Sequence, residues 1–503
     1  MIARFWSAAV SGIDGFLVAV EFDLANGLPC FKTVGLPDGS VREARERVVS
    51  AVRNAGFEFP GRRVTVNLSP AETRKAGTHF DLPIALGALA ASEQVEAVSS
   101  AADLCFLGEL ALDGAVRPVS GVLSMAAAAR RRGLRGVVVP RENLREAAAS
   151  PGLEAYGVST LREAVDLLRG ALPERLPEPE EEPLPAGGED LGDVRGQALA
   201  RRAVELAAAG GHNLLLIGPP GTGKSMLARR LPGLLPPLGR EEALEVTRVY
   251  SVCGRLPPGG GLVRARPFRA PHHTTTPTAL VGGGARCRPG EVTLAHRGVL
   301  FLDEWPEFGR EALESLRQPM EDRCVGVSRL RESVLYPSDF TLVAAMNPCP
   351  CGYLGHPGRR CECTERDVRR YRGRVSGPLL DRVDLQAELS PVPFAEWEGV
   401  GPVPESTAEV RGRVLAARAF ARGRGSRELN ARLAGADLRE ACRVDGDGRL
   451  LLEAAARRSA LSPRGLDRLL RVARTAADLE GSGPVLRKHL AEAASYLGKW
   501  RTL

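Results

Sequence analysis

A short glycine-rich stretch places the strongest constraint on how this chain can fold. The residues GPPGTGKS, Gly218 to Ser225, follow the apolar run NLLLI and precede the helix-forming run MLARRL. This order of strand, loop and helix is the context that the phosphate-binding pattern G-x-x-x-x-G-K-[ST] requires. The glycines let backbone N–H groups wrap phosphates, and the helix adds the positive end of its dipole. The stretch therefore predicts an α/β domain that binds a nucleotide.

The residues of this loop have separate expected roles. Lys224 is expected to neutralise the β- and γ-phosphates of the nucleotide, and the Ser225 hydroxyl to ligate Mg²⁺. The full set of residues expected to bind the nucleotide is Gly218, Pro219, Pro220, Gly221, Thr222, Gly223, Lys224 and Ser225.

Two further apolar runs, GVLFLDE and FTLVAAMN, end in polar residues. Continuous apolar runs of this kind are typical of central parallel strands whose carboxyl ends carry a site. We expect Asp303 to lie near Mg²⁺, Glu304 to polarise the attacking water, and Asn347 to hydrogen-bond the γ-phosphate or the water. An Asp-Glu pair is often only a solvated corner, but its combination with the phosphate-binding loop predicts ATP hydrolysis.

The chain of 503 residues is long enough for two to four domains. Residues 171–190 are rich in Pro and Glu and predict an extended tether. Before it, RRVTVNLSP and RGVVVP read as strands and FDLPIALGALAAS as a buried helix, and from about residue 405 the pattern is helical. We therefore expect domains at 1–170, 191–400 and 401–503, joined by the 171–190 tether.

Composition limits the location and the partners. No stretch has the layout of a signal peptide or the length of a membrane span, so a cytoplasmic protein without membrane contact is expected. The net charge of +7 invites a nucleic-acid interpretation. Only five of the 68 basic residues are lysine, however, which indicates a GC-rich genome as much as a function. Net charge therefore gives slight support for DNA binding.

The order of these motifs resembles the AAA+ ATPases, and the block PFRAPHHTTTPTALVGGG narrows the resemblance to the magnesium-chelatase-like branch. VSGPLLDRVDL resembles the arginine-finger segment of that branch, and LSPRGLDRLLRVARTAADL its sensor-2 helix. The resemblance implies that Arg382 reaches the γ-phosphate of a neighbouring subunit and that Arg464 reaches the nucleotide of its own. Arg374 is the second candidate for the neighbouring site, and a surface salt bridge is the alternative for either arginine.

The N-terminal part resembles the proteolytic domain of Lon in SPAETRKAGTHFDLPIALGALAAS and LDGAVRPVSGVLSMAAAARRRGLRGVVVPREN. The resemblance implies an α+β domain of the S5 type. Lon-type peptidases use a serine activated by a lysine. Those two positions fall on His79 and Leu123 here, and Ser124 and Lys75 do not match them. We therefore expect the fold without the peptidase chemistry; His79 is then a structural histidine or, alternatively, a new general base.

The whole arrangement is identified as a member of the YifB/ComM family of bacterial ATPases. The resemblance implies a homo-hexameric ring that binds single-stranded or branched DNA and drives branch migration in natural transformation, or competence. The alternative is a chelatase-type motor that remodels a protein partner. An ATP-dependent protease is disfavoured by the residues at positions 79 and 123.

The segment at about 262–297 is expected to form a hairpin that tracks DNA phosphates. It is rich in arginine and holds a GGG turn at 282–284. The candidate DNA contacts are Arg264, Arg266, Arg269, Arg286 and Arg288, with His272, His273 and Arg297 beside them. The alternative is that the histidines pack against the nucleotide core and that the arginines reflect the overall composition.

Four of the ten cysteines lie in NPCPCGYLGHPGRRCECT, residues 347–364. Two C-x-C pairs, Cys349 with Cys351 and Cys361 with Cys363, offer four thiolates for a structural tetrahedral Zn²⁺. An iron–sulfur cluster and a metal-free buried loop are the alternatives. If zinc braces this loop, Cys361→Ser is expected to impair ring assembly and DNA-coupled activity more than nucleotide binding.

Overall fold

The computed structural model describes residues 2–171, 174–176, 189–284, 287–329, 332–398, 403–458 and 461–498. The chain divides into two compact units, Met1–Pro183 with Gly239–Arg264 and Leu184–Leu238 with Ala265–Leu503. Most of the expected 171–190 tether lies outside the described residues. Within it, Glu174 and Arg175 form the short edge strand β10, which pairs antiparallel with β9.

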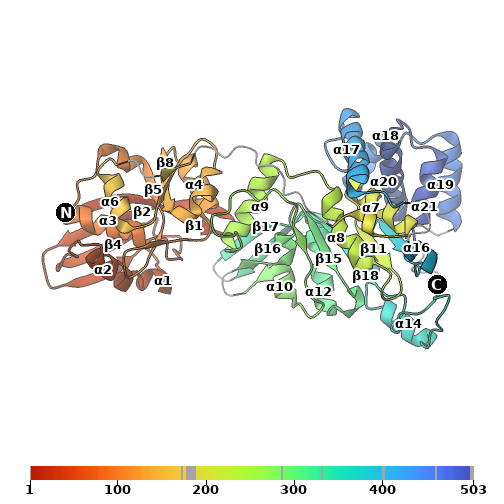
Figure 1. Ribbon diagram of the computed structural model, residues 1–503, viewed down its shortest axis with the longest axis horizontal. Helices are drawn as coiled ribbons and strands as arrows, with labels where there is room; N and C mark the ends of the chain where they lie inside the picture. Colours follow the sequence, from red (N-terminus) through yellow and green to blue (C-terminus); the bar gives the residue numbers. More distant parts are fainter. Residues whose placement is uncertain are drawn as a thin grey trace. The chain divides into compact units, whose positions relative to one another are not determined.

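The first unit is organised around an eight-stranded sheet with the order β10-β9-β8-β5-β1-β2-β4-β3 (Figure 1). Its two longest strands, β1 and β2, pair antiparallel from Ile2 opposite Asp23 to Ser11 opposite Asp14. The strands are β1 (Ile2–Ser11), β2 (Asp14–Ala25), β3 (Cys30–Val34), β4 (Arg63–Ser69), β5 (Leu104–Phe106), β8 (Gly136–Pro140), β9 (Glu154–Val158) and β10 (Glu174–Arg175), with β6 (Glu109–Leu110) and β7 (Val116–Arg117) as a separate ribbon.

Helices cover both faces of this sheet. Because side chains alternate along a strand, Phe5 and Ala9 of β1 enter one core with α2, α3 and α6, whereas Ala8 enters another with α4 and α5. The helices are α1 (Gly39–Arg42), α2 (Ala44–Asn54), α3 (Asp81–Ala91), α4 (Val122–Arg131), α5 (Leu144–Ala148) and α6 (Leu161–Leu168). The two strands and the buried helix expected before the tether are confirmed as β4, β8 and α3.

The first unit also contains α9 (Arg240–Val252), which lies within the 191–400 range expected for the nucleotide-binding domain. The helix packs on α4. The buried carboxylate of Glu146 accepts hydrogen bonds from the Ser251 hydroxyl and from the Leu123 backbone N–H. Burial raises the pKa of Glu146, although these hydrogen bonds oppose the shift. The chain therefore leaves the second unit after Leu238 and returns to it at Ala265.

The second unit contains a parallel five-stranded sheet with the order β12-β15-β18-β11-β19. Its strands are β11 (Leu214–Ile217), β12 (Phe268–Arg269), β15 (Val299–Leu302), β18 (Thr341–Met346) and β19 (Leu385–Glu388). The three apolar runs expected to be central parallel strands are confirmed as β11, β15 and β18. Two hairpins flank the sheet, β13 (Gly282–Gly283) with β14 (Arg288–Pro289) and β16 (Cys324–Arg329) with β17 (Glu332–Pro337).

Helices complete the second unit and form most of its C-terminal part, drawn in blue in Figure 1. Helices α7, α8, α17 and α20 share one core with β11 and β18, so the C-terminal helices are anchored on the nucleotide-binding sheet. The bounds are α7 (Ala198–Gly210), α8 (Lys224–Leu234), α10 (Pro277–Val281), α11 (Glu291–Leu294), α12 (Arg310–Ser315), α13 (Arg317–Asp322), α14 (Glu365–Arg372), α15 (Gly377–Leu380), α16 (Phe394–Glu398), α17 (Thr407–Gly423), α18 (Gly435–Cys442), α19 (Gly446–Arg458), α20 (Pro463–Leu479) and α21 (Arg487–Ser495).

The fold class expected from the sequence is confirmed: a mixed α/β chain with a parallel sheet and a helical C-terminal part. Among the described residues, no helix is both long and apolar enough to cross a bilayer.

Candidate nucleotide site

The glycine-rich loop leaves the carboxyl end of β11, in the middle of the parallel sheet, and leads into α8. Gly221 and Gly223 adopt φ values of 78° and 92°. Residues with a Cβ rarely adopt this left-handed conformation, and the two glycines therefore permit the tight wrap of the loop. The loop lies beside the carboxyl end of β18, since β11 and β18 pair in parallel from Leu214 to Ile217.

Lys224 begins α8 and is 8% exposed. Its Nζ donates hydrogen bonds to the carbonyl oxygens of Gly218 and Pro219, at 2.6 and 2.8 Å, and to Oδ1 of Asn347 at 3.1 Å. Burial lowers the pKa of Lys224 to about 8, although the nearby Asp303 carboxylate opposes the shift. The ammonium group therefore links the loop to the residue at the end of β18.

Ser225 and Asp303 lie together as expected for magnesium ligands. Oγ of Ser225 donates to Oδ2 of Asp303 at 2.8 Å. Adjacent ligands of an octahedral Mg²⁺ at 2.0–2.1 Å are about 2.9 Å apart. A hydroxyl and a carboxylate oxygen at this spacing fit the ion, which in such a site shields the phosphate charge.

Glu304 follows Asp303 at the end of β15 and has a left-handed backbone, with φ of 52°. Its Oε2 lies 3.1 Å from Nδ1 of His273, and its backbone N–H donates to Oδ1 of Asp303 at 3.0 Å. From the sequence, His273 was expected only to pack against the nucleotide core or to lie beside the DNA contacts. Its contact with Glu304 places it in the candidate site, and the position of PHHTTTP directly after β12 was the available signal.

The three candidate arginines differ in their surroundings. Arg382 is 13% exposed; it forms an ion pair with Glu321, and its Nη1 donates to the Pro378 carbonyl at 2.6 Å. Arg374 pairs with Glu307 at 2.5 Å and is 48% exposed.

Arg464 lies exposed in the first turn of α20. Within the described part of the chain, it has no hydrogen bond or ion pair, so its side chain is available for a ligand. Arg468, one turn further along α20, was missed by the sequence analysis. Its Nη1 donates to the carbonyls of Leu380 and Val383, at 3.1 and 3.0 Å, and thereby ties α20 to the segment that carries Arg382.

Some of the arginines expected to contact DNA have hydrogen-bond partners within the chain. Arg269 forms a bidentate pair with Glu291, at 2.6 and 2.9 Å. Arg266 donates to the carbonyls of Pro236 and Arg297. Both guanidinium groups thus have partners within their own unit, and their contact with DNA stays a prediction.

Arg288 is exposed on the β13–β14 hairpin and Arg264 is half-buried, whereas Arg286 lies outside the described residues. Arg297 pairs with Asp339 at 2.9 Å. The segment contains a hairpin as expected, but with strands of only two residues.

The four clustered cysteines converge. Their Sγ atoms all lie within 4.8 Å of one another, and Cys349–Cys351, Cys349–Cys361 and Cys351–Cys361 are separated by 3.4, 3.6 and 3.6 Å. The backbone N–H groups of Leu354 and Cys351 donate to Sγ of Cys349 and Cys363. The cluster can therefore hold a metal ion.

In the first unit, His79 is 4% exposed and burial lowers its pKa to about 4, although a hydrogen bond with the Ala8 backbone opposes the shift. Leu123 is buried, and the Ser124 hydroxyl donates to the Ile13 carbonyl at 2.6 Å. Lys75 is fully buried, and burial lowers its pKa. Among the described residues, no serine hydroxyl is hydrogen-bonded to a lysine amine.

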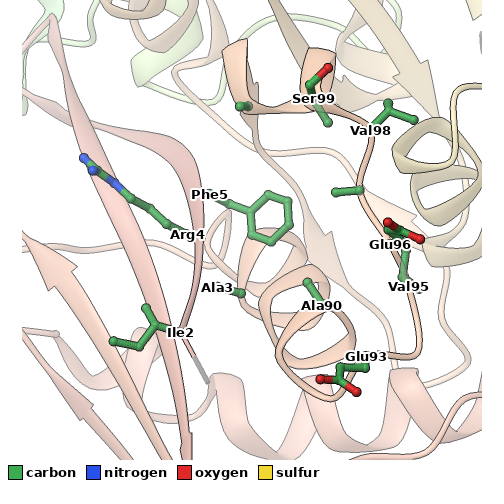
Figure 2. A pocket seen from close by; sticks show the side chains of 13 residues that line it. Ile2, Ala3, Arg4, Phe5, Ala90, Glu93, Val95, Glu96, Val98 and Ser99 are labelled. Atoms are coloured by element: carbon green, nitrogen blue, oxygen red, sulfur yellow. The ribbon is translucent and has the colours of Figure 1, made fainter.

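The first unit also contains a cavity of about 580 Å³ between the start of β1, the end of α3 and residues 93–102. Figure 2 shows the Phe5 ring directed between β1 and the loop that carries Val95 and Val98. The lining is mainly apolar, and its charged residues, Arg4, Glu93 and Glu96, form no catalytic pair.

Comparisons with known proteins agree with this architecture. The family model described as magnesium chelatase, subunit ChlI, matches residues 190–397, a second model of the same subunit matches residues 20–143, and a model of its C-terminal part matches residues 404–497. The parallel sheet, the phosphate-binding loop and the helical C-terminal part define a magnesium-chelatase-like AAA+ protein, a motor class that uses nucleotide and Mg²⁺.

Full-length relatives define the family more closely. The uncharacterized protein YifB of Salmonella typhimurium is 44% identical over 495 residues, which cover 98% of this chain and 97% of YifB. The competence protein ComM of Haemophilus influenzae is 42% identical over 509 residues, which cover 100% of this chain and 98% of ComM. The chain belongs to the YifB/ComM family.

A Lon protease of Acinetobacter baumannii is 25% identical over 188 residues, which cover 35% of this chain and 23% of that protease. This weaker similarity agrees with the resemblance of the N-terminal part to Lon.

Proposed function

We propose that this protein is an ATP-hydrolysing ring motor that binds and remodels DNA. One observation carries the hydrolytic part of the proposal: Lys224, Ser225, Asp303, Glu304 and Asn347 meet at the carboxyl edge of one parallel sheet. This edge is where such folds bind their ligands. The Lys224 ammonium group would bind the phosphates, and the Ser225 and Asp303 oxygens would ligate Mg²⁺. The Glu304 carboxylate would accept a proton from the attacking water.

Each residue has a separate part in the proposed reaction. Lys224 would exchange its bonds to the loop carbonyls for bonds to phosphate oxygens. Glu304 would accept a proton from the attacking water as the bond from the γ-phosphorus to the bridging oxygen breaks and ADP leaves. Asn347 would orient the water or the γ-phosphate.

Two arginines would stabilise the charge that develops. Arg464 is exposed on the same subunit, whereas Arg382 would act on the site of a neighbouring subunit. This neighbour role requires a ring, which we propose to be a homo-hexamer. Since Arg382 is paired with Glu321 in the single chain, assembly would have to replace that ion pair with contacts to the adjacent nucleotide.

The DNA part of the proposal has two supports. A full-length relative carries the name competence protein ComM, and Arg288 is exposed on a hairpin next to the nucleotide-binding sheet. Single-stranded or branched DNA is the proposed substrate, branch migration in transformation the proposed process, and the cytoplasm the proposed location.

The first unit is proposed to lack peptidase activity. A serine–lysine mechanism needs both groups within hydrogen-bond reach. His79 and Leu123 occupy the two matching positions, and the Ser124 hydroxyl is bonded to a backbone carbonyl. The unit would then have a structural role, and it includes α9 from the middle of the chain.

The metal proposed for the four cysteines is a structural Zn²⁺. A tetrahedral ZnS₄ site with bonds of 2.3 Å has sulfur atoms about 3.8 Å apart, close to the separations of 3.4 to 3.6 Å. Backbone hydrogen bonds from Tyr353 and Glu362 lower the pKa of Cys351 to about 6 against the opposing effect of burial, so a thiolate is available. In an iron–sulfur cluster the four thiolates bind more than one iron atom, and thiolates on different irons lie further apart than thiolates on a single Zn²⁺.

A labelled four-way DNA junction tests the proposed function. With ATP and Mg²⁺, the protein is expected to resolve the junction into two duplexes, and Glu304→Gln is expected to bind ATP without doing so. Binding of the junction with no ATP-dependent resolution, or failure to bind DNA at all, would contradict the DNA proposal. Hydrolysis that responds to a protein partner instead would favour the chelatase-type alternative.

A further inference from the structure

The loop that carries the four clustered cysteines, here called the cysteine loop (residues 348–363), contacts the nucleotide site at two places. Only Pro348 separates Asn347, which accepts a hydrogen bond from Lys224, from the buried Cys349. Further along, a Cβ atom on Gly352 would lie 2.7 Å from Cδ of Pro220 in the glycine-rich loop. Real Cβ atoms do not come so close to a neighbour, so the backbone of the cysteine loop lies directly against the phosphate-binding loop.

The helix that follows the cysteine loop, α14, packs back against the start of the loop. Thr364 follows Cys363 and caps α14, whose last turn lies against the end of β18. Nη2 of Arg372 donates to the Pro348 carbonyl at 3.4 Å. Burial raises the pKa of Tyr371 to about 12, and its oxygen is hydrogen-bonded to the backbone of Asn347. Residues 348–372 therefore form a closed loop that begins and ends at the strand end next to Lys224.

The charges around the cluster are compatible with a filled site. Four thiolates and one Zn²⁺ carry a net charge of −2, and the buried Arg372 lies within electrostatic reach of both Cys349 and Glu388. A buried cation is costly unless a negative group compensates it. The loop is also too small and too polar for a core of its own, so a metal would be its main source of rigidity.

We propose that Zn²⁺ at Cys349, Cys351, Cys361 and Cys363 positions the phosphate-binding loop, so that nucleotide binding depends on this metal. The filled loop holds Gly352 against Pro220 and Asn347 toward Lys224. This proposal rests on the proposed function only in that it requires a nucleotide at this loop; DNA and a ring are not involved. It also differs from the expectation that metal loss would impair ring assembly and DNA-coupled activity more than nucleotide binding, because the contact with Pro220 is not visible in the sequence.

A metal-ligand variant gives the first test. Cys361→Ser removes a ligand that lies far along the chain from the glycine-rich loop. We expect loss of zinc by elemental analysis and about tenfold weaker binding of a fluorescent ADP analogue without DNA, which corresponds to about 1.4 kcal/mol. Cys324→Ser, outside the cluster, is the matched control and is expected to keep both. A reversible test on the unmodified protein uses a zinc-selective chelator followed by added Zn²⁺, with nucleotide affinity expected to fall and recover.

A glycine pair tests the contact itself. Gly352 and Gly355 have φ values of 86° and 77°, so an alanine is equally strained at either position. A Cβ on Gly352 would meet Pro220, whereas a Cβ on Gly355 would meet nothing within 4 Å. Gly352→Ala is expected to weaken ADP binding with zinc retained, and Gly355→Ala is expected to leave it unchanged.

The outcomes separate this inference from the proposed function. Unchanged nucleotide affinity in metal-free Cys361→Ser, equal effects of the two glycine variants, or unmodified protein without zinc would overturn the positioning role while hydrolysis remained intact. A protein that holds zinc but binds no nucleotide would instead contradict the proposed ATPase.

Discussion

His273 Nδ1 lies 3.1 Å from Oε2 of Glu304, the carboxylate proposed to accept the proton of the attacking water. The two residues come from different strand ends, since His273 follows β12 and Glu304 follows β15. A carboxylate oxygen engaged by a histidine is not free to accept a proton from water. The contact occupies one of the two carboxylate oxygens of Glu304, and we expect it to restrain the proposed catalytic base.

Replacing His273 tests this restraint. In His273→Ala, the DNA-independent ATPase rate is expected to rise by up to roughly fivefold, the equivalent of about 1 kcal/mol for a partly exposed polar contact. His272→Ala is the matched control, because His272 contacts Thr274 instead. A steady-state phosphate-release assay compares the two variants, and equal rates would show that the pair does not restrain Glu304.

The pKa of Lys224, lowered to about 8 by burial, predicts a pH dependence of nucleotide binding. Phosphates bind the protonated amine, and below pH 8 that form predominates in the free protein. As the pH rises above 8, the free protein loses the proton that binding must restore, so the Kd for ADP should rise by about tenfold per pH unit. Calorimetry at pH 8 in two buffers of different ionisation enthalpy should detect proton uptake. A Kd that is the same at pH 7 and pH 9 would be inconsistent with a depressed lysine.

A mixing experiment separates the arginine roles. Arg382→Ala is expected to lower the ATPase rate by roughly 1000-fold. Arg464→Ala is expected to lower it by a similar factor. Mixing Arg382→Ala with Glu304→Gln should restore part of the activity, because an Arg382→Ala subunit keeps Glu304 and can receive the intact Arg382 of a Glu304→Gln neighbour. Arg464→Ala mixed with Glu304→Gln should stay inactive, since both groups must belong to one subunit. Activity in the second mixture but not in the first would reverse the assignments.

Asp478 holds two arginines in the C-terminal helices. Its carboxylate lies 3.0 Å from both Arg424 and the fully buried Arg474 and accepts a hydrogen bond from Asn430 at 2.7 Å. Asp478→Ala leaves these cations without their partner and should destabilise the helical part by about 3–5 kcal/mol. Urea unfolding measures the change, with the exposed Asp437→Ala as a control expected to shift it little.

Much of the nucleotide site could be predicted from the sequence because its residues follow strands that are recognisable by themselves. The runs before Gly218, Asp303 and Asn347 are short and almost entirely apolar and buried. Parallel pairing then brings their carboxyl ends to one edge. Local pattern and topology were therefore sufficient to bring these side chains together, although their roles remain predictions.

Contacts between segments distant in the chain were not predictable in the same way. Arg269 forms an ion pair with Glu291. From composition alone, its guanidinium group had been expected to bind DNA. The packing of α9 in the first unit depends on the buried Glu146, more than ninety residues earlier in the chain. The contact of Gly352 with Pro220 depends on backbone geometry, which residue type alone does not specify.

The steady-state ATPase rate with and without branched DNA tests the central claim most directly. We expect the purified protein to hydrolyse ATP slowly alone and at least several-fold faster with a DNA junction, and we expect Glu304→Gln to show neither rate. ATP hydrolysis that is unchanged by single-stranded and branched DNA would contradict the proposed DNA motor, and no hydrolysis under any condition would contradict the proposed ATPase.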